Sequence, residues 1–283
     1  MPPDDLMNCL ALTSDYAGSK GSPEPALRHM AAAGFRYVHW CHEWRSDYLY
    51  TAAEIRRIAA WFDEFGLALN DLHASAGTVY SWQAPDEALR AAGIDLVKNR
   101  IAMAAQLKSD VVVMHMLEPP GERERAASWA RLRRALDALQ PEARSRGVRI
   151  ALENLPEGNQ ELIARALATY GPEFLGICYD AGHGNLTGDG LDWLERHRER
   201  LIALHLHDNH GATDQHLPLF AGTVDWRRLA GLITRSSYAK QAMTLESNNR
   251  EMPSVDIVEF PRLMAECGRR FAALVEAARA GRK

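Results

Sequence analysis

The chain has 283 residues, of which 47% are apolar and 25% charged, and its formal net charge is −4. This composition is ordinary for a globular protein with a sizeable core and argues against disorder. The negative charge and the pI near 6.3 argue against a broad surface that neutralises nucleic-acid phosphates. No apolar run approaches the ~20 residues of a membrane span. Residues 1–5 lack the basic start of a secretory leader and the four cysteines are scattered, so we expect a reduced, cytoplasmic protein.

Short apolar strands alternate with amphipathic helices along the whole chain. The pattern predicts eight strands, at residues 9–14, 37–41, 67–72, 110–116, 149–153, 175–180, 202–207 and 243–246. The spacing of apolar residues predicts helices at 51–65, 86–108, 122–146, 161–170, 191–200, 226–238 and 257–280. The first of these opens with a capping box, Thr-Ala-Ala-Glu, and is closed by Gly66. No linker divides the series, so we expect residues 1–283 to form a single domain.

The succession of strands and helices predicts the fold class. The strands are apolar enough to be covered on both faces, which favours a parallel sheet with right-handed crossovers. Eight such units closed into a ring form a (β/α)8, or TIM, barrel. An open doubly wound sheet is the alternative, but the glycine-rich phosphate turn expected after its first strand is missing.

Polar side chains gather at the C-terminal ends of six successive strands, the third to the eighth. Because barrel enzymes assemble their sites at that face, the joint occurrence predicts one shared site. The densest stretch is 201–216, where four histidines and two aspartates fall within a dozen positions. The candidate residues at and after these strand ends are His73, His115, Glu153, Asp180, His183, His205, His207, Asp214, His216 and Glu246.

The residue types at these ends predict a divalent metal site. Two glutamates, one aspartate and one histidine form a mostly oxygen ligand set, which favours Mn²⁺, with Mg²⁺, Co²⁺ and Zn²⁺ as alternatives. If the remaining histidines also face inward, the nitrogen count rises, and zinc and more than one ion become competitive.

Five short motifs carry a resemblance to a known family. They are Ala-Leu-Glu-Asn at 151–154, Gly-Ile-Cys-Tyr-Asp-Ala-Gly-His at 176–183, His-Leu-His-Asp at 205–208, Asp-Gln-His at 214–216 and Thr-Leu-Glu at 244–246. With these motifs the chain resembles the xylose isomerase-like TIM barrel superfamily over nearly its whole length. That superfamily holds sugar epimerases, inosose dehydratases, hydroxypyruvate isomerases and the endonuclease IV family of abasic-site nucleases.

The resemblance implies roles for individual residues. The metal ligands would be Glu153, Asp180, His205 and Glu246. The two glutamates would also move protons, and His183 would contact substrate oxygens. His205 is preferred to His207 as the ligand because the family pattern, a histidine followed three positions later by an acid, matches the spacing to Asp208.

The first functional hypothesis is a metal-dependent isomerase or epimerase of a sugar or polyol, acting through an enediolate. Trp40, His42 and Trp44, after the second strand, could stack on a sugar ring, and Arg250, past the last strand, could bind hydroxyls. The residues expected to bind substrate are therefore His73, His115, His183, His207, Asp214, His216, Trp40 and Arg250. The expected partner is a small carbohydrate, and a homo-oligomer is left open.

Two alternatives use the same site. An endonuclease IV-like zinc phosphodiesterase is favoured by His73, His115, Asp214 and His216, but the net charge disfavours a duplex-binding protein. A metal-dependent lyase or dehydratase of a keto-sugar or keto-inositol is the second.

The loop at 219–226 keeps only one of the two family glycines, Gly222, so we expect a different loop path, with Phe220 reaching the site or a partner subunit. No cluster of Lys or Arg stands beside a strand end, which favours an unphosphorylated substrate.

Overall fold

A computed structural model describes residues 6–116, 121–238 and 242–281 of the protein. All eight predicted strands are present, each within one residue of its expected ends. They are β1 (Leu10–Thr13), β2 (Tyr37–Trp40), β3 (Ala68–His73), β4 (Val111–His115), β5 (Arg149–Glu153), β6 (Leu175–Asp180), β7 (Leu201–Leu206) and β8 (Met243–Leu245).

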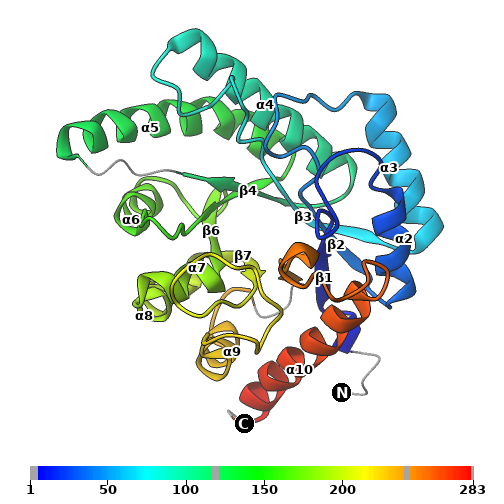
Figure 1. The fold of residues 1–283 in the computed structure, drawn as a ribbon. Helices are drawn as coiled ribbons and strands as arrows, with labels where there is room; N and C mark the ends of the chain where they lie inside the picture. The colour runs from blue at the N-terminus through cyan, green and yellow to red at the C-terminus, as the bar shows by residue number, and fades with distance from the viewer. Residues whose placement is uncertain (1–5, 117–120, 239–241, 282–283) are drawn as a thin grey trace.

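The strands form one closed, parallel barrel in the order of the chain. Each strand pairs with the next, and β8 pairs with β1 through the register Leu10 to Met243. This ring confirms the TIM barrel and excludes the open doubly wound sheet. Figure 1 shows the helices arranged around the strands.

The helices are α2 (Glu24–Ala32), α3 (Ala52–Phe65), α4 (Glu87–Gln106), α5 (Glu122–Ser145), α6 (Gln160–Thr169), α7 (Ala181–Thr187), α8 (Gly190–His197), α9 (Trp226–Ile233) and α10 (Phe260–Ala280), with short 3₁₀ turns η1 (Arg198–Arg200) and η2 (Asn249–Glu251). The capping box is present: the Thr51 hydroxyl accepts from the Glu54 N–H, and a Glu54 oxygen accepts from the Thr51 N–H. Gly66 ends α3 in the left-handed conformation, with φ of 67°. The sequence did not predict α2 or α7, and α9 ends earlier than expected.

Two apolar layers hold the barrel together. Large side chains between strands and helices form the main core, while small and medium residues fill the barrel interior, namely Val111, Val113, Ala151, Cys178, Ile202 and Ala203. Because side chains alternate across a strand, the residues two positions beyond the interior layer also face inward, at the C-terminal ends. Four of these positions are His115, Glu153, Asp180 and His205. None of the helices in the three described segments has the length and apolar composition that a membrane span requires.

Candidate metal centre

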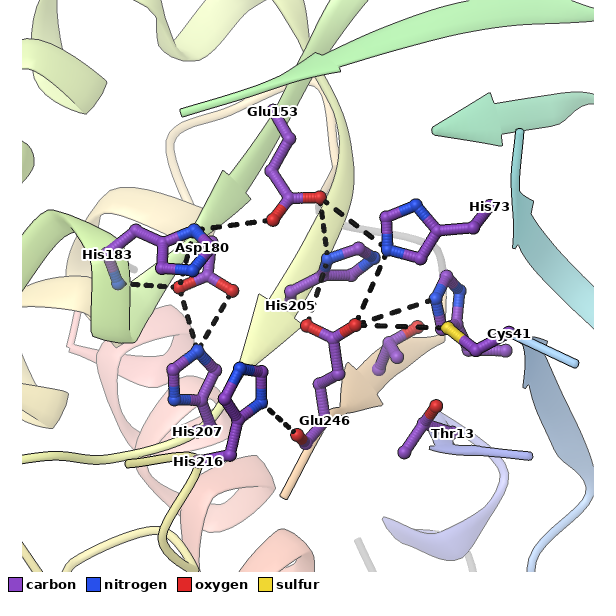
Figure 2. A network of polar contacts seen from close by, with 12 residues as sticks. Thr13, Cys41, His73, Glu153, Asp180, His183, His205, His207, His216 and Glu246 are labelled. Atoms are coloured by element: carbon purple, nitrogen blue, oxygen red, sulfur yellow. Dashed lines mark hydrogen bonds and ion pairs between the residues drawn. The ribbon is translucent and has the colours of Figure 1, made fainter. Parts of the chain in front are cut away.

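Four side chains from four successive strands converge at the C-terminal end of the barrel. They are Glu153 at the end of β5, Asp180 at the end of β6, His205 in β7 and Glu246 just after β8, and we call them the central cluster (Figure 2). One candidate ligand atom of each lies within 4.8 Å of those of the other three. His205 Nδ1 is 3.1 Å from both Glu153 Oε2 and Glu246 Oε2.

The charges of the central cluster are suited to a cation. Burial opposes the ionisation of Glu153, but the charges of His115 and His205 hold the pKa of its carboxyl well below its usual range. Burial likewise opposes ionisation of Glu246, and His205 and then His73 keep its pKa well below its usual range. Neither ring nitrogen of His205 has a hydrogen-bond partner among the described residues, although the side chain is fully buried. Buried carboxylates around an imidazole that makes no hydrogen bond fit a divalent metal.

A second group lies beside the central cluster. It consists of His183, His207, Asp214 and His216, whose candidate ligand atoms also lie within 4.8 Å of one another. His183 donates from Nδ1 to the Asn154 carbonyl at 2.9 Å, and His216 donates from Nδ1 to the Glu246 carbonyl at 2.8 Å. Both rings therefore turn Nε2 toward Asp214 Oδ2, at 3.4 and 3.3 Å. Fixing one ring nitrogen on a carbonyl so that the other is free is how proteins orient histidine ligands.

His207, a member of the second group, also contacts the central cluster. Its Nε2 is 3.0 Å from each oxygen of Asp180, and its ring stacks on His216 with centroids 3.8 Å apart. His207 therefore contacts Asp180 directly, and His205 is the histidine that faces the two glutamates.

A third group, His73, His115 and Glu153, lies on the β3 and β4 side. His115 Nε2 is 3.1 Å from Glu153 Oε2, while His73 Nε2 is 3.8 Å from the same oxygen. Burial lowers the pKa of His73 to about 4, so its ring is neutral at pH 7. The indole of Trp44 stacks on His73, with centroids 4.7 Å apart and 17° between the planes. Glu153 thus belongs to both the central cluster and this group.

A cavity of about 200 Å³ opens over these groups. Its wall includes both glutamates, and the full lining is Trp44, Arg45, His73, His115, Glu153, Leu155, Pro156, Glu157, His183, Asp214, His216 and Glu246. A neighbouring cavity of about 190 Å³ shares Trp44, Arg45, His73 and His115. Both are below the roughly 300–1,000 Å³ of pockets for drug-sized ligands, which suits a small polar molecule.

Three expected contacts with the site are not made. Trp40 points away from the barrel interior, donates from Nε1 to the Tyr50 hydroxyl at 3.0 Å and lines a separate cavity of about 400 Å³. His42 lines that same separate cavity. Arg250 in η2 is 71% exposed, pairs with Glu251 and lines neither cavity at the strand ends.

Phe220 also lies away from the pocket. Its ring packs on Trp226 of α9, with centroids 5.6 Å apart, and the Arg270 guanidinium of α10 lies 3.8 Å from its centroid. The loop turns Phe220 toward the outer helices and not into the site, so the expected contact of Phe220 with the site is not made.

One residue that the sequence reasoning missed faces the site from β2. His39 is fully buried, and its Nε2 lies 3.9 Å from Glu246 Oε1. His39 lies inside a strand, one residue before Trp40, so a search for polar residues at the strand ends did not find it. Strand alternation could have found it, because His39 and Trp40 must point to opposite faces.

The chain matches the family model of the xylose isomerase-like TIM barrel over residues 27–267. The uncharacterized protein y4fM of Sinorhizobium fredii (strain NBRC 101917 / NGR234) is 35% identical over 256 residues, which cover 76% of this chain and 79% of that protein. Two solved structures share the fold. A D-tagatose 3-epimerase-like protein has a TM-score of 0.76 at 19% identity, covering 95% of this chain and 98% of that one. An L-ribulose 3-epimerase has a TM-score of 0.75 at 18% identity, covering 96% of both chains. Because the family model extends from α2 into α10, the protein belongs to the xylose isomerase-like TIM barrel family.

Proposed function

We propose that the protein is a divalent-metal-dependent isomerase or epimerase of a sugar or polyol. The observation that carries the proposal is the convergence of Glu153 and Glu246 on one point with Asp180 and His205. Solved structures with the same fold include a D-tagatose 3-epimerase-like protein and an L-ribulose 3-epimerase, which supports this reaction class. The four cysteines are free, which fits a cytoplasmic enzyme.

In this proposal the two glutamates move the proton. A divalent cation held by Glu153, Asp180, His205 and Glu246 would polarise two adjacent substrate oxygens and acidify the C–H between them. Glu153 and Glu246 come from β5 and β8, three strands apart, so their carboxylates flank a substrate from different directions. One removes the proton and the other returns it. Both carboxyls have a lowered pKa and are ionised at neutral pH, as a base must be.

The remaining pocket residues hold the substrate and exclude water. Trp44 offers an aromatic surface at the cavity wall, and His183 and His115 offer ring nitrogens to hydroxyl groups. We propose Mn²⁺ for the central cluster, because three carboxylates and one imidazole form a mostly oxygen ligand set. Asp180→Ala should remove this ion, because the three protein ligands that remain do not suffice to retain it through purification.

The test is proton exchange with solvent. The Mn²⁺-loaded protein is incubated in D2O with a panel of ketoses and keto-polyols, and deuterium incorporation is measured by mass spectrometry and NMR. Deuterium entering a C–H beside a carbonyl is the expected result. If substrate is consumed with loss of water and no deuterated isomer forms, the reaction is that of a lyase or dehydratase and not an isomerisation.

A second candidate function is zinc-dependent phosphodiester cleavage. It is favoured by the two histidine-rich groups, His73 with His115 and Glu153, and His183 with Asp214 and His216, which place nitrogen ligands on both sides of the central cluster. Clusters of metal ions can clamp the attacking and leaving oxygens of a phosphodiester. Incubation of the Zn²⁺-loaded protein with an abasic-site duplex decides between the two: strand nicking without deuterium exchange would favour the nuclease.

A further inference from the structure

A buried histidine that the proposed reaction does not use lies beneath the pocket. His39 has no exposed surface and lines neither cavity at the strand ends. Its ring lies 4.5 Å from the His205 ring and 5.1 Å from the His73 ring, measured between centroids. The candidate ligand atoms of His39, His73, His205 and Glu246 lie within 4.8 Å of one another. We call His39, His73 and Glu246 the floor cluster.

Asp71 fixes the orientation of His39. The His39 Nδ1–H donates to Asp71 Oδ1 at 2.6 Å, and both side chains are buried. Asn70 donates to Asp71 Oδ2 at 3.2 Å, and the Thr244 hydroxyl lies 3.4 Å from Asp71 Oδ1. Because the Asp71 carboxylate accepts this hydrogen bond, the proton of the His39 ring belongs on Nδ1. The lone pair of Nε2 therefore points toward Glu246.

An irregularity in the barrel builds this arrangement. The register between β2 and β3 shifts between Val38 and His39, which pair with Leu69 and Asp71, so Asn70 is an extra residue. Its amide also donates to the Ala242 carbonyl and the Thr244 hydroxyl across the barrel, both at 3.1 Å. The bulge thus brings two consecutive polar residues, Asn70 and Asp71, to the barrel floor, where a regular strand would present one.

The lone pair of His39 Nε2 has no partner. This nitrogen is buried and makes no hydrogen bond with any described residue. A buried polar atom without a partner destabilises the fold, and a bound ion or water commonly satisfies such an atom. The carboxylate that Nε2 faces, Glu246, cannot donate a hydrogen bond when ionised.

Glu246 presents its two oxygens to two different groups. Oε2 faces His205 of the central cluster at 3.1 Å, while Oε1 lies 3.5 Å from His73 Nε2 and 3.9 Å from His39 Nε2. Ligands at zinc-ligand distances and tetrahedral angles are about 3.4 Å apart. The distance from Oε1 to His73 Nε2 is close to this value, and the distance to His39 Nε2 is somewhat longer.

We propose that, in the resting enzyme, His39, His73 and Glu246 hold a second divalent cation, a zinc ion, and that Glu246 bridges it to the ion of the central cluster until one of its oxygens takes up the substrate proton. Two imidazoles and one carboxylate match the three protein ligands of an open zinc site. This ion is nitrogen-rich, whereas the central cluster is oxygen-rich, so the two positions differ in metal preference. Asp71 is a positioning residue that holds the His39 ring in the ligating tautomer.

Zinc binding to single-site variants tests the proposal. The protein is stripped with a chelator and titrated with ZnCl2, and the bound zinc is measured by calorimetry and, after dialysis, by plasma mass spectrometry. His39→Gln should lose one equivalent of zinc. Asp71→Asn keeps the ligands but not the tautomer, and it should weaken the same equivalent by about 10–100-fold, the usual effect of removing an orienting partner. Co²⁺ loaded in place of zinc should lose part of its visible absorption in both variants.

Two comparisons make the result decisive. His42→Gln removes a buried histidine three positions further along, outside the floor cluster, and should keep the parent zinc content. Asp180→Ala should lose a different equivalent, so that the double variant with His39→Gln loses both. If His39→Gln and Asp71→Asn bind zinc as the parent does, Nε2 faces a water and the floor site is disproved, while loss of zinc from Asp180→Ala would still support the central ion. Should His39→Gln not fold, as judged by circular dichroism, Asp71→Asn decides alone.

Discussion

Asp208 is a buried carboxylate that organises the loop after β7. One oxygen accepts from the N–H groups of Asn209 and Val224 at 2.9 and 3.1 Å, and the other accepts from the Trp226 indole at 2.9 Å. The backbone of Asp208 also pairs with that of Leu217, which directly follows the stretch containing Asp214 and His216. Asp208 therefore ties both ends of this loop to the barrel.

Asp208→Ala should destabilise the protein strongly, because three buried donors lose their acceptor. We expect the free energy of unfolding to fall by about 3 kcal/mol. Asp225→Ala is the control: it removes only the cap on the Arg228 N–H of α9 and should cost about 1 kcal/mol. Urea unfolding followed by circular dichroism measures both. Equal losses in the two variants would contradict the role given to Asp208.

Glu246→Gln separates metal binding from proton transfer. Glutamine keeps the shape and one ligand oxygen but removes the basic oxygen. The variant should retain most of its Mn²⁺ and lose at least ~100-fold in turnover, the scale of a positioned general base. Metal analysis and deuterium exchange are measured together, with Glu251→Gln in the nearby η2 as the control. A variant that holds metal and turns over at the parent rate would assign the proton to another group, such as His183.

The strand ends made much of this site predictable. Glu153, Asp180 and His205 were predictable because each interrupts or ends an apolar strand, where a charged residue has few structural reasons to be. Trp40 and His39 were not separable in the same way. Both lie in β2. Which face of the strand turns inward decides that His39 faces the interior while Trp40 packs against Tyr50. The metal-binding role of these residues stays a prediction.

At the scale of elements, one carboxylate holds residues 78–80 of the segment between β3 and α4. Asp47 accepts from the Thr78 N–H and hydroxyl, at 2.8 and 2.6 Å, and from the N–H groups of Val79 and Tyr80. Trp82, further along the same segment, lines the cavity beside Trp44. Asp47 therefore fixes the residues that directly precede this part of the cavity wall.

The order of this segment should depend on pH. Burial alone would raise the pKa of Asp47, but the hydrogen bonds from Thr78, Tyr80 and Val79 outweigh it and lower the pKa to about 2. Because the folded pKa is below the ordinary 3.8, the stabilisation is complete above pH 4 and is lost as the pH falls toward 2. Hydrogen exchange of the Val79 and Tyr80 amides, corrected for intrinsic rates, should accelerate over this range. In Asp47→Asn the exchange of these amides should already be fast at neutral pH. Unchanged protection in this variant would contradict the role given to Asp47.

Element types were easier to predict than element ends. The strongly periodic α3 and α10 were expected, whereas α7 was not. Its sequence has two glycines and little apolar periodicity, and it begins because Asp180 caps the His183 N–H at 2.7 Å. The path of the loop at 219–226 depended on Asp208 and on packing against α10, which local sequence does not encode.

On the scale of the whole molecule, the barrel and the metal should stabilise each other. Glu153, Asp180 and Glu246 are at least nine-tenths buried and close together. A cation that binds only the folded protein stabilises it by about 2.7 kcal/mol at 100 times its Kd. For a chain of this size we expect a rise in Tm of roughly 5 °C. Calorimetry of chelator-stripped protein with and without MnCl2 measures it, with KCl at equal ionic strength as the control. Equal Tm values would argue against a metal at the central cluster.

Because β8 pairs with β1, the barrel can close only after its last strand has been synthesised. On the ribosome, the side chains of β5, β6 and β7 emerge before Glu246, which follows the last strand. Until β8 arrives, β1 and β7 each keep an unpaired edge, and the pocket lacks one wall. A nascent chain therefore holds three of the four converging side chains without the fourth, and the complete centre exists only once the two ends of the ring have met.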